Sequence, residues 1–115
     1  MELKSETVEF RDGTKITVTE ENWDIGTRLE LMERELRESK GVTPEEYARR
    51  SLYNRMAACS SGDVPTEAEA RQWPSAELDK WYFAAKRINP GWFAAFDAAV
   101  DQAQAQKKKL QKRHK

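Results

Sequence analysis

The chain has 115 residues, of which 38% are hydrophobic and 35% charged, with a formal net charge of zero and a mean hydropathy of -0.91. This length indicates one domain, and the eleven aromatic residues exclude a fully disordered chain. The longest apolar runs have five residues, far fewer than the roughly 20 that cross a bilayer. We therefore expect a soluble protein with a small core beneath a highly charged surface.

The charges are unevenly distributed along the chain. All twenty acidic residues precede Lys107, and six of the last nine residues are Lys or Arg. Residues 1–106 therefore carry a formal charge of -6 and residues 107–115 a charge of +6. We expect a single domain over residues 1–106, followed by a basic, flexible tail over residues 107–115.

The compartment follows from two observations. Cys59 is the only cysteine, so an internal disulfide is excluded. The first ten residues contain no apolar segment of the kind found in signal peptides. Both features favour a cytoplasmic protein, in the host cytoplasm if the protein is viral.

The first 18 residues predict a β-hairpin. Thr7–Phe10 and Thr14–Val18 alternate in polarity and are rich in β-branched residues. A two-residue Asp-Gly loop would mix the two faces, whereas a three-residue loop with a left-handed Gly13 keeps the apolar residues together. The second register, which we prefer, pairs Phe10 with Thr14, Val8 with Ile16, Glu6 with Val18, Glu9 with Lys15 and Thr7 with Thr17. Both strands could serve as open edges for another chain.

Three helices are expected before residue 75. The first follows Thr19 as its N-cap, carries an apolar stripe and ends at Gly41. The second opens with a capping box from Thr43 to Glu46 and ends at Ser60–Asp63. A short third helix opens at Thr66 and stops before Pro74. The inward stripes comprise Ile25, Leu29, Met32 and Leu36 in the first helix, and Ala48, Leu52, Met56 and Cys59 in the second.

The block Leu78–Val100 holds six of the eleven aromatic residues and is cut by an Asn-Pro-Gly sequence. It predicts two helices, the first capped by Ser75 and the second by Asn89-Pro90. Phe83 is expected to point outward, away from the stripe of its helix. The inward residues are Leu78, Trp81, Tyr82, Ala85 and Ile88, then Trp92, Phe93, Phe96, Val100 and Ala103. The predicted fold is mainly α, with an N-terminal β-hairpin over residues 1–18 packed on a bundle of four to five helices over residues 19–106.

No residue pattern indicates catalysis. The single histidine, His114, lies in the basic tail, and Cys59 lies on an apolar stripe where a buried, inert thiol is expected. Metal-ligand spacings and glycine-rich phosphate loops are missing from the sequence. We therefore expect no catalytic residue, no metal and no cofactor, and a protein that is not an enzyme.

Four apolar residues lie off the inward stripes of their helices and are the candidates for partner binding. Exposed singly they would need no explanation, but clustered in space they would form a contact surface. Both alternatives stay open from the sequence. The four are Phe83, Trp23, Leu31 and Tyr53.

The basic tail allows two interpretations. Its cations could contact nucleic-acid phosphates, or they could keep the chain soluble and complement a helix C-terminus. The acidic body disfavours nucleic acid, since binders usually show a basic face on the folded part. The candidate phosphate contacts are Lys107, Lys108, Lys109, Lys112, Arg113 and Lys115.

The order of these features resembles that of the tail assembly chaperones of long-tailed bacteriophages. A short hairpin leads into a charged helical body that ends in LDKWYFAAKRINPGWF and a basic tail. The resemblance implies a small, helical, non-enzymatic protein that binds the tape-measure protein and keeps it soluble during tail assembly. It implies a protein client and leaves self-association open. The alternative is a small nucleic-acid-associated regulator that uses the tail.

Overall fold

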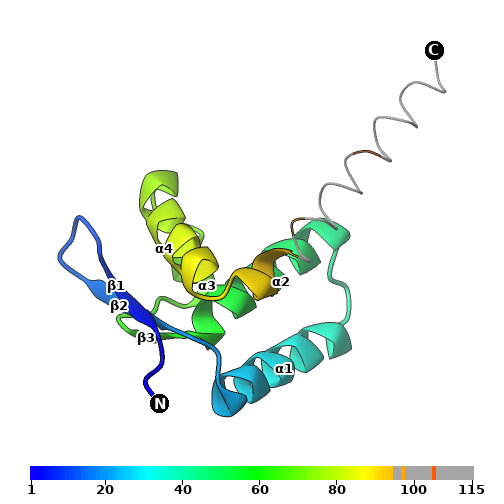
Figure 1. Ribbon diagram of the computed structural model, residues 1–115. Coiled ribbons are helices and arrows are strands. Elements are labelled where there is room, and N and C mark those ends of the chain that lie inside the picture. The colour runs from blue at the N-terminus through cyan, green and yellow to red at the C-terminus, as the bar shows by residue number, and fades with distance from the viewer. Residues whose placement is uncertain (95–96, 98–104, 106–115) are drawn as a thin grey trace.

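The computed structural model describes residues 1–94, 97 and 105 (Figure 1). The predicted mainly α fold with an N-terminal hairpin is confirmed, and the tail residues 107–115, together with Phe96, Val100 and Ala103, lie outside the described residues. A further helix begins at residue 90. The elements before it are β1 (Ser5–Glu9), β2 (Lys15–Thr19), α1 (Trp23–Glu38), α2 (Pro44–Ala58), β3 (Ser60–Gly62), α3 (Glu67–Ala70) and α4 (Ser75–Ile88).

The hairpin has the preferred register. Val8 pairs with Ile16 and Thr7 with Thr17, and the Phe10 N–H donates to Thr14 O at 2.9 Å. Gly13 has a φ of 88°, which supplies the left-handed residue of a three-residue loop. The turn is closed by the Asp12 carboxylate, which accepts hydrogen bonds from the backbone and side chain of Thr14.

A third strand corrects two of the expectations. Ser60–Gly62, expected only as the end of a helix, pairs antiparallel with β2 to give the strand order β1-β2-β3. The expectation that both hairpin strands are open edges was therefore wrong for β2, which lies in the middle. Three small residues have no strand periodicity, so this pairing depends on the hairpin that lies beside them.

For α1 to α4, the helix starts agree with the sequence in two cases and differ in two. Thr43 caps α2 and Thr66 caps α3, the latter with a complete capping box. The first helix, however, is capped by Asn22 and not by Thr19. Thr19 still belongs to the sheet, where its N–H donates a hydrogen bond to Cys59 O at 2.8 Å. The predicted Ser75 cap is also wrong, since the helix begins at Ser75 with Pro74 in the N-cap position. At the other end of α1, Ser39 is the C-cap and precedes the expected Gly41.

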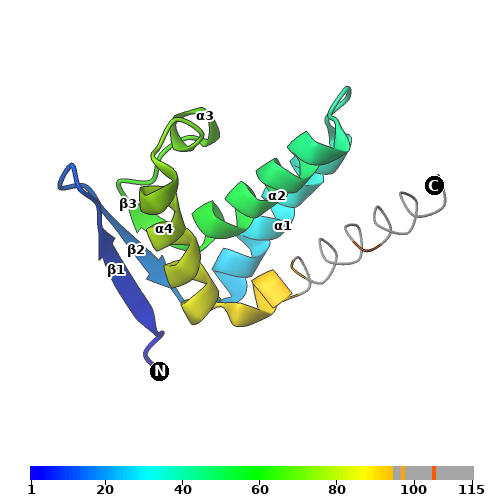
Figure 2. The same ribbon diagram turned by 90° about the horizontal axis from the view of Figure 1, so that it is seen from above.

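Three layers build the fold, as Figure 2 shows: α4 lies between the sheet and the α1–α2 pair. Trp81 of α4 is fully buried at the centre, and its Nε1 donates to Ser60 Oγ at 2.9 Å. The rings of Tyr53 and Trp73 each pack 6.2 Å from that of Trp81. The aromatic helix therefore holds the sheet and the α-helical pair together.

The Asn-Pro-Gly sequence turns the chain sharply after α4. The Asn89 side chain, expected to cap the next helix, instead donates to Thr19 O at 3.0 Å and accepts from Glu21 N–H at 2.8 Å. The Trp92 indole N–H donates to the Glu21 carboxylate at 2.7 Å. This corner is thus bonded to the link between β2 and α1, about seventy residues earlier in the chain.

Candidate functional site

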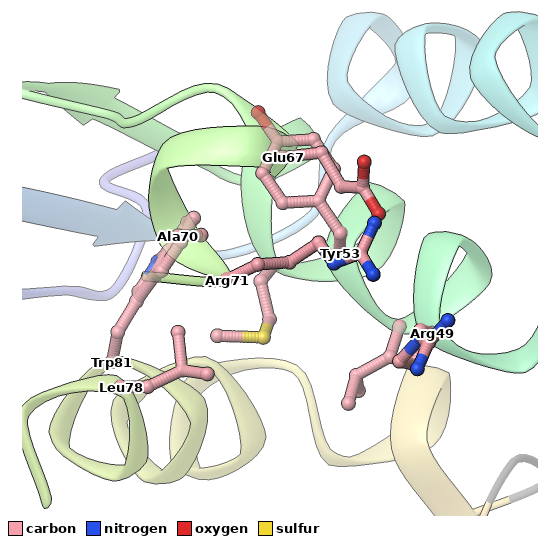
Figure 3. A pocket seen from close by; sticks show the side chains of 9 residues that line it. Arg49, Tyr53, Glu67, Ala70, Arg71, Leu78 and Trp81 are labelled. Carbon is pink, nitrogen blue, oxygen red and sulfur yellow. The ribbon is translucent and has the colours of Figure 1, made fainter. Parts of the chain in front are cut away.

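An apolar cavity opens between α2, α3 and α4. Its volume is about 120 Å³, and nearly all of its lining is apolar. Figure 3 shows the side chains that surround it, contributed by all three helices. They are Arg49, Leu52, Tyr53, Met56, Glu67, Ala70, Arg71, Leu78 and Trp81.

The helical spacing of the sequence places these residues together. On α2, Leu52 and Met56 lie one turn apart and face the same neighbour. On α4, Leu78 and Trp81 do the same. The small side chain of Ala70, itself buried on α3, fills less of the space than a larger residue would. The cavity is thus the space that remains between the apolar faces of α2, α3 and α4.

Tyr53 connects the wall of the cavity to the base of α3. Its hydroxyl donates to Pro65 O at 2.7 Å, immediately before the Thr66 cap. Partial burial, followed by the carboxylates of Glu67 and Glu69, raises the pKa of Tyr53 above its ordinary value of 10.0. The hydroxyl therefore stays protonated at neutral pH and keeps its role as a donor.

The cavity mouth carries charge of both signs. Arg49 and Arg71 are exposed, and Glu67 is half-buried. A volume of about 120 Å³ is below the roughly 300–1,000 Å³ of small-molecule pockets and close to the roughly 150 Å³ of an apolar cavity that accepts benzene. The site is therefore suited to a single apolar side chain or ring.

The four predicted contact residues occupy different places. Trp23 and Leu31 are exposed on α1, at 89% and 56%. Phe83, exposed at 50%, lines a groove between α4 and β1. Strand β1 lies on the opposite side of α4 from α1 (Figure 2). Tyr53 is half-buried in the cavity wall. The structure therefore brings Trp23 and Leu31 onto one helix but does not gather all four on one surface.

The sequence did not reveal the cavity. Leu52, Met56, Leu78 and Trp81 were all expected to face inward, and they do. Apolar periodicity reports which face of a helix is turned inward, but it carries no information on whether the opposing faces fill the space between them. Ala70 lies in a helix of only four residues, which is too short for an apolar stripe to be recognised.

The described residues contain no group of three or more His, Cys, Asp or Glu that could hold a metal ion. Cys59 is buried, and burial raises the pKa of its thiol, which disfavours the reactive thiolate. Over the same part of the chain, no helix is both long enough and apolar enough to span a membrane.

No family model, curated protein or solved structure matches this chain significantly.

Proposed function

We propose that the protein is a non-enzymatic, cytoplasmic protein-binding protein that acts as a phage tail assembly chaperone. In this proposal the cavity between α2, α3 and α4 receives an apolar side chain from a tape-measure client. Covering such side chains would keep the client soluble until tail assembly. The proposal rests on the sequence resemblance described above together with the cavity.

The observation that carries the proposal is an open apolar cavity of single-side-chain size. Apolar side chains normally fill the space between packed helices. Full burial of one aliphatic or aromatic side chain contributes about 1.5–3 kcal/mol, or roughly ten- to a hundredfold in affinity. A cavity of this size thus supports anchoring of a protein segment better than binding of a cofactor.

Two further features fit a protein client. Trp23 and Leu31 are large exposed residues eight positions apart on α1, so they would add apolar contact to a segment that extends beyond the cavity. The formal charge of -6 over residues 1–106 would favour a basic client and speed its association.

A cavity-filling variant tests the proposal. Ala70→Leu places a larger side chain in the cavity, whereas Ala68→Leu makes the same change on the exposed side of the same helix. If a neighbouring gene encodes a very long coiled-coil protein, overlapping segments of that protein are co-expressed with each variant. The readout is the fraction of each segment that remains soluble.

The wild-type protein and Ala68→Leu are expected to keep at least one segment soluble. Ala70→Leu is expected to lower the soluble fraction of that segment, because loss of the cavity weakens binding about tenfold or more. Circular dichroism of each variant checks that the fold is retained. Equal activity in the two variants would rule out the cavity as the binding site. If no neighbouring gene encodes such a protein, or no segment is kept soluble, the chaperone proposal is wrong.

A further inference from the structure

Strand β1 has an open edge whose hydrogen-bonding groups can be assigned. Phe10 N–H donates to Thr14 O, and Lys4 O accepts from Glu20 N–H, so the even-numbered residues of this strand bond to β2. Because pairing alternates along an antiparallel strand, the N–H and C=O groups of Ser5, Thr7 and Glu9 point away from β2. Within the described part of the chain these groups have no hydrogen-bond partner.

Several of the features that block strand addition are missing from this edge, although the strand is short and carries two carboxylates. Ser5–Glu9 contains no proline or lysine, and its unbroken register with β2 leaves no bulge. Both carboxylates of the strand face cations. Glu6 forms an ion pair with Arg87 at 2.7 Å, and Glu9 lies opposite Lys15.

A groove beside the edge carries an exposed aromatic side chain. It is lined by β1 and by Lys80, Phe83 and Arg87 of α4. These three residues are spaced by three and four positions, so they form one stripe along the helix. A strand added to β1 would therefore lie against Phe83, and its inward side chains would cover that ring.

The strand is complementary to itself in one register. Among antiparallel arrangements that use the outward groups, the one centred on Thr7 pairs all five residues of each strand. It sets Ser5 opposite Glu9 and Glu6 opposite Val8, so no two like charges face each other. Shifting the centre to Glu6 sets two carboxylates opposite each other, and centring on Ser5, Val8 or Glu9 shortens the overlap.

We propose that β1 pairs antiparallel with β1 of a second copy of this chain, with Thr7 on the twofold axis. Two three-stranded sheets then form one six-stranded sheet. Phe83 of each copy then lies beside the inward residues of the partner's strand, Glu6 and Val8, because it lines the groove along this edge. The existing contact between the hydroxyls of Thr7 and Thr17, 2.9 Å apart, extends into a row of threonines across the dimer.

This interface is small. Stable interfaces usually involve about 20–30 residues a side, whereas this one uses a five-residue strand and one helix face. We therefore expect a reversible dimer that forms with rising protein concentration. It does not involve the cavity, so this proposal and the chaperone proposal can fail independently.

Cysteine cross-linking of the full-length chain tests the register. Paired residues of the hydrogen-bonded type lie about 5.5 Å apart at Cα, within the roughly 4.4–6.8 Å that a disulfide spans. Thr7→Cys is therefore expected to form a covalent dimer on oxidation. Ser5→Cys and Glu9→Cys alone would place their thiols more than about 13 Å from their own copies, and are expected to cross-link only when mixed. The wild-type protein controls for Cys59, which is buried.

Sedimentation of two Thr7 variants tests the backbone pairing. Thr7→Pro removes an outward N–H that the monomer does not use, a change tolerated at sheet edges. Thr7→Val keeps that N–H. The wild-type protein and Thr7→Val are expected to dimerise, and Thr7→Pro to stay monomeric. A wild-type protein that is monomeric at all concentrations would overturn the proposal. So would a dimer that persists in Thr7→Pro, or cross-linking of Ser5→Cys alone as fast as Thr7→Cys. If Thr7→Pro does not fold, the cross-linking pattern decides.

Discussion

At the scale of single residues, Gly62 occupies a position that other residues fit only with strain. Its φ is 93°, and a Cβ atom there would lie 2.8 Å from Lys15 O in the neighbouring strand. The first property disfavours any residue with a side chain, and the second brings the added atom against backbone that cannot move freely. Gly91 has neither restriction, since it is exposed and a Cβ would meet nothing within 4 Å.

We expect Gly62→Ala to lower the free energy of unfolding by about 1–3 kcal/mol or more. The cost of a left-handed residue adds to that of the close contact with Lys15 O. Gly91→Ala, the matched control, is expected to be neutral or to stabilise by up to about 1 kcal/mol. Urea denaturation of both variants measures the difference. Equal effects would show that β3 does not pair with β2 as described.

At the scale of elements, ion pairs join the hairpin to α4. Arg11 in the turn of the hairpin contacts the Glu77 carboxylate at 3.1 Å, and Lys80 contacts the same carboxylate at 3.0 Å. The hydrogen bond from Lys80, opposed by burial and helped by Arg11, holds the pKa of Glu77 below its ordinary value of 4.5. The carboxylate is therefore charged at neutral pH and attracts both cations.

This lowered pKa predicts a pH dependence of stability. The folded state holds the Glu77 proton less tightly than the unfolded state does. The contribution of Glu77 to the free energy of unfolding is therefore complete above a pH of about 4.5, and it is lost as the pH falls through the lower, folded-state pKa. The melting temperature should drop over that range, and by less in Glu77→Gln. Asp79→Asn, at an exposed position of the same helix, is the control and should follow the wild-type curve. A Glu77→Gln curve that parallels the wild type would contradict the assigned role.

At the scale of the whole molecule, an acidic body precedes a basic tail whose residues lie outside the described structure. If the tail bound nucleic acid, the affinity would fall steeply between about 50 and 200 mM salt. Under the chaperone proposal we expect no tail-dependent binding to duplex DNA or RNA. Truncation after Gln106 should therefore leave nucleic-acid binding unchanged while the client segments stay soluble. Salt-sensitive binding that disappears on truncation would favour the regulatory alternative.

Local chemistry was enough to predict much of the fold. The hairpin register followed from alternating polarity and a glycine in the loop, and the Thr43 and Thr66 caps followed from side chains that bond their own helix starts. These features depend on residues close together in the chain, so a single sequence contains the information. The outward orientation of Phe83 was predicted for the same reason, because helical spacing alone determines it.

Long-range packing settled the rest. Strand β3 exists because β2 lies beside it. The Asn89 side chain holds the β2–α1 link across about seventy residues instead of capping the helix that follows it. The cavity opens where α2, α3 and α4 meet, and β2 is not an open edge because β3 pairs with its other side. None of these features has a local sequence signal, since each depends on distances between segments that only the folded chain brings together.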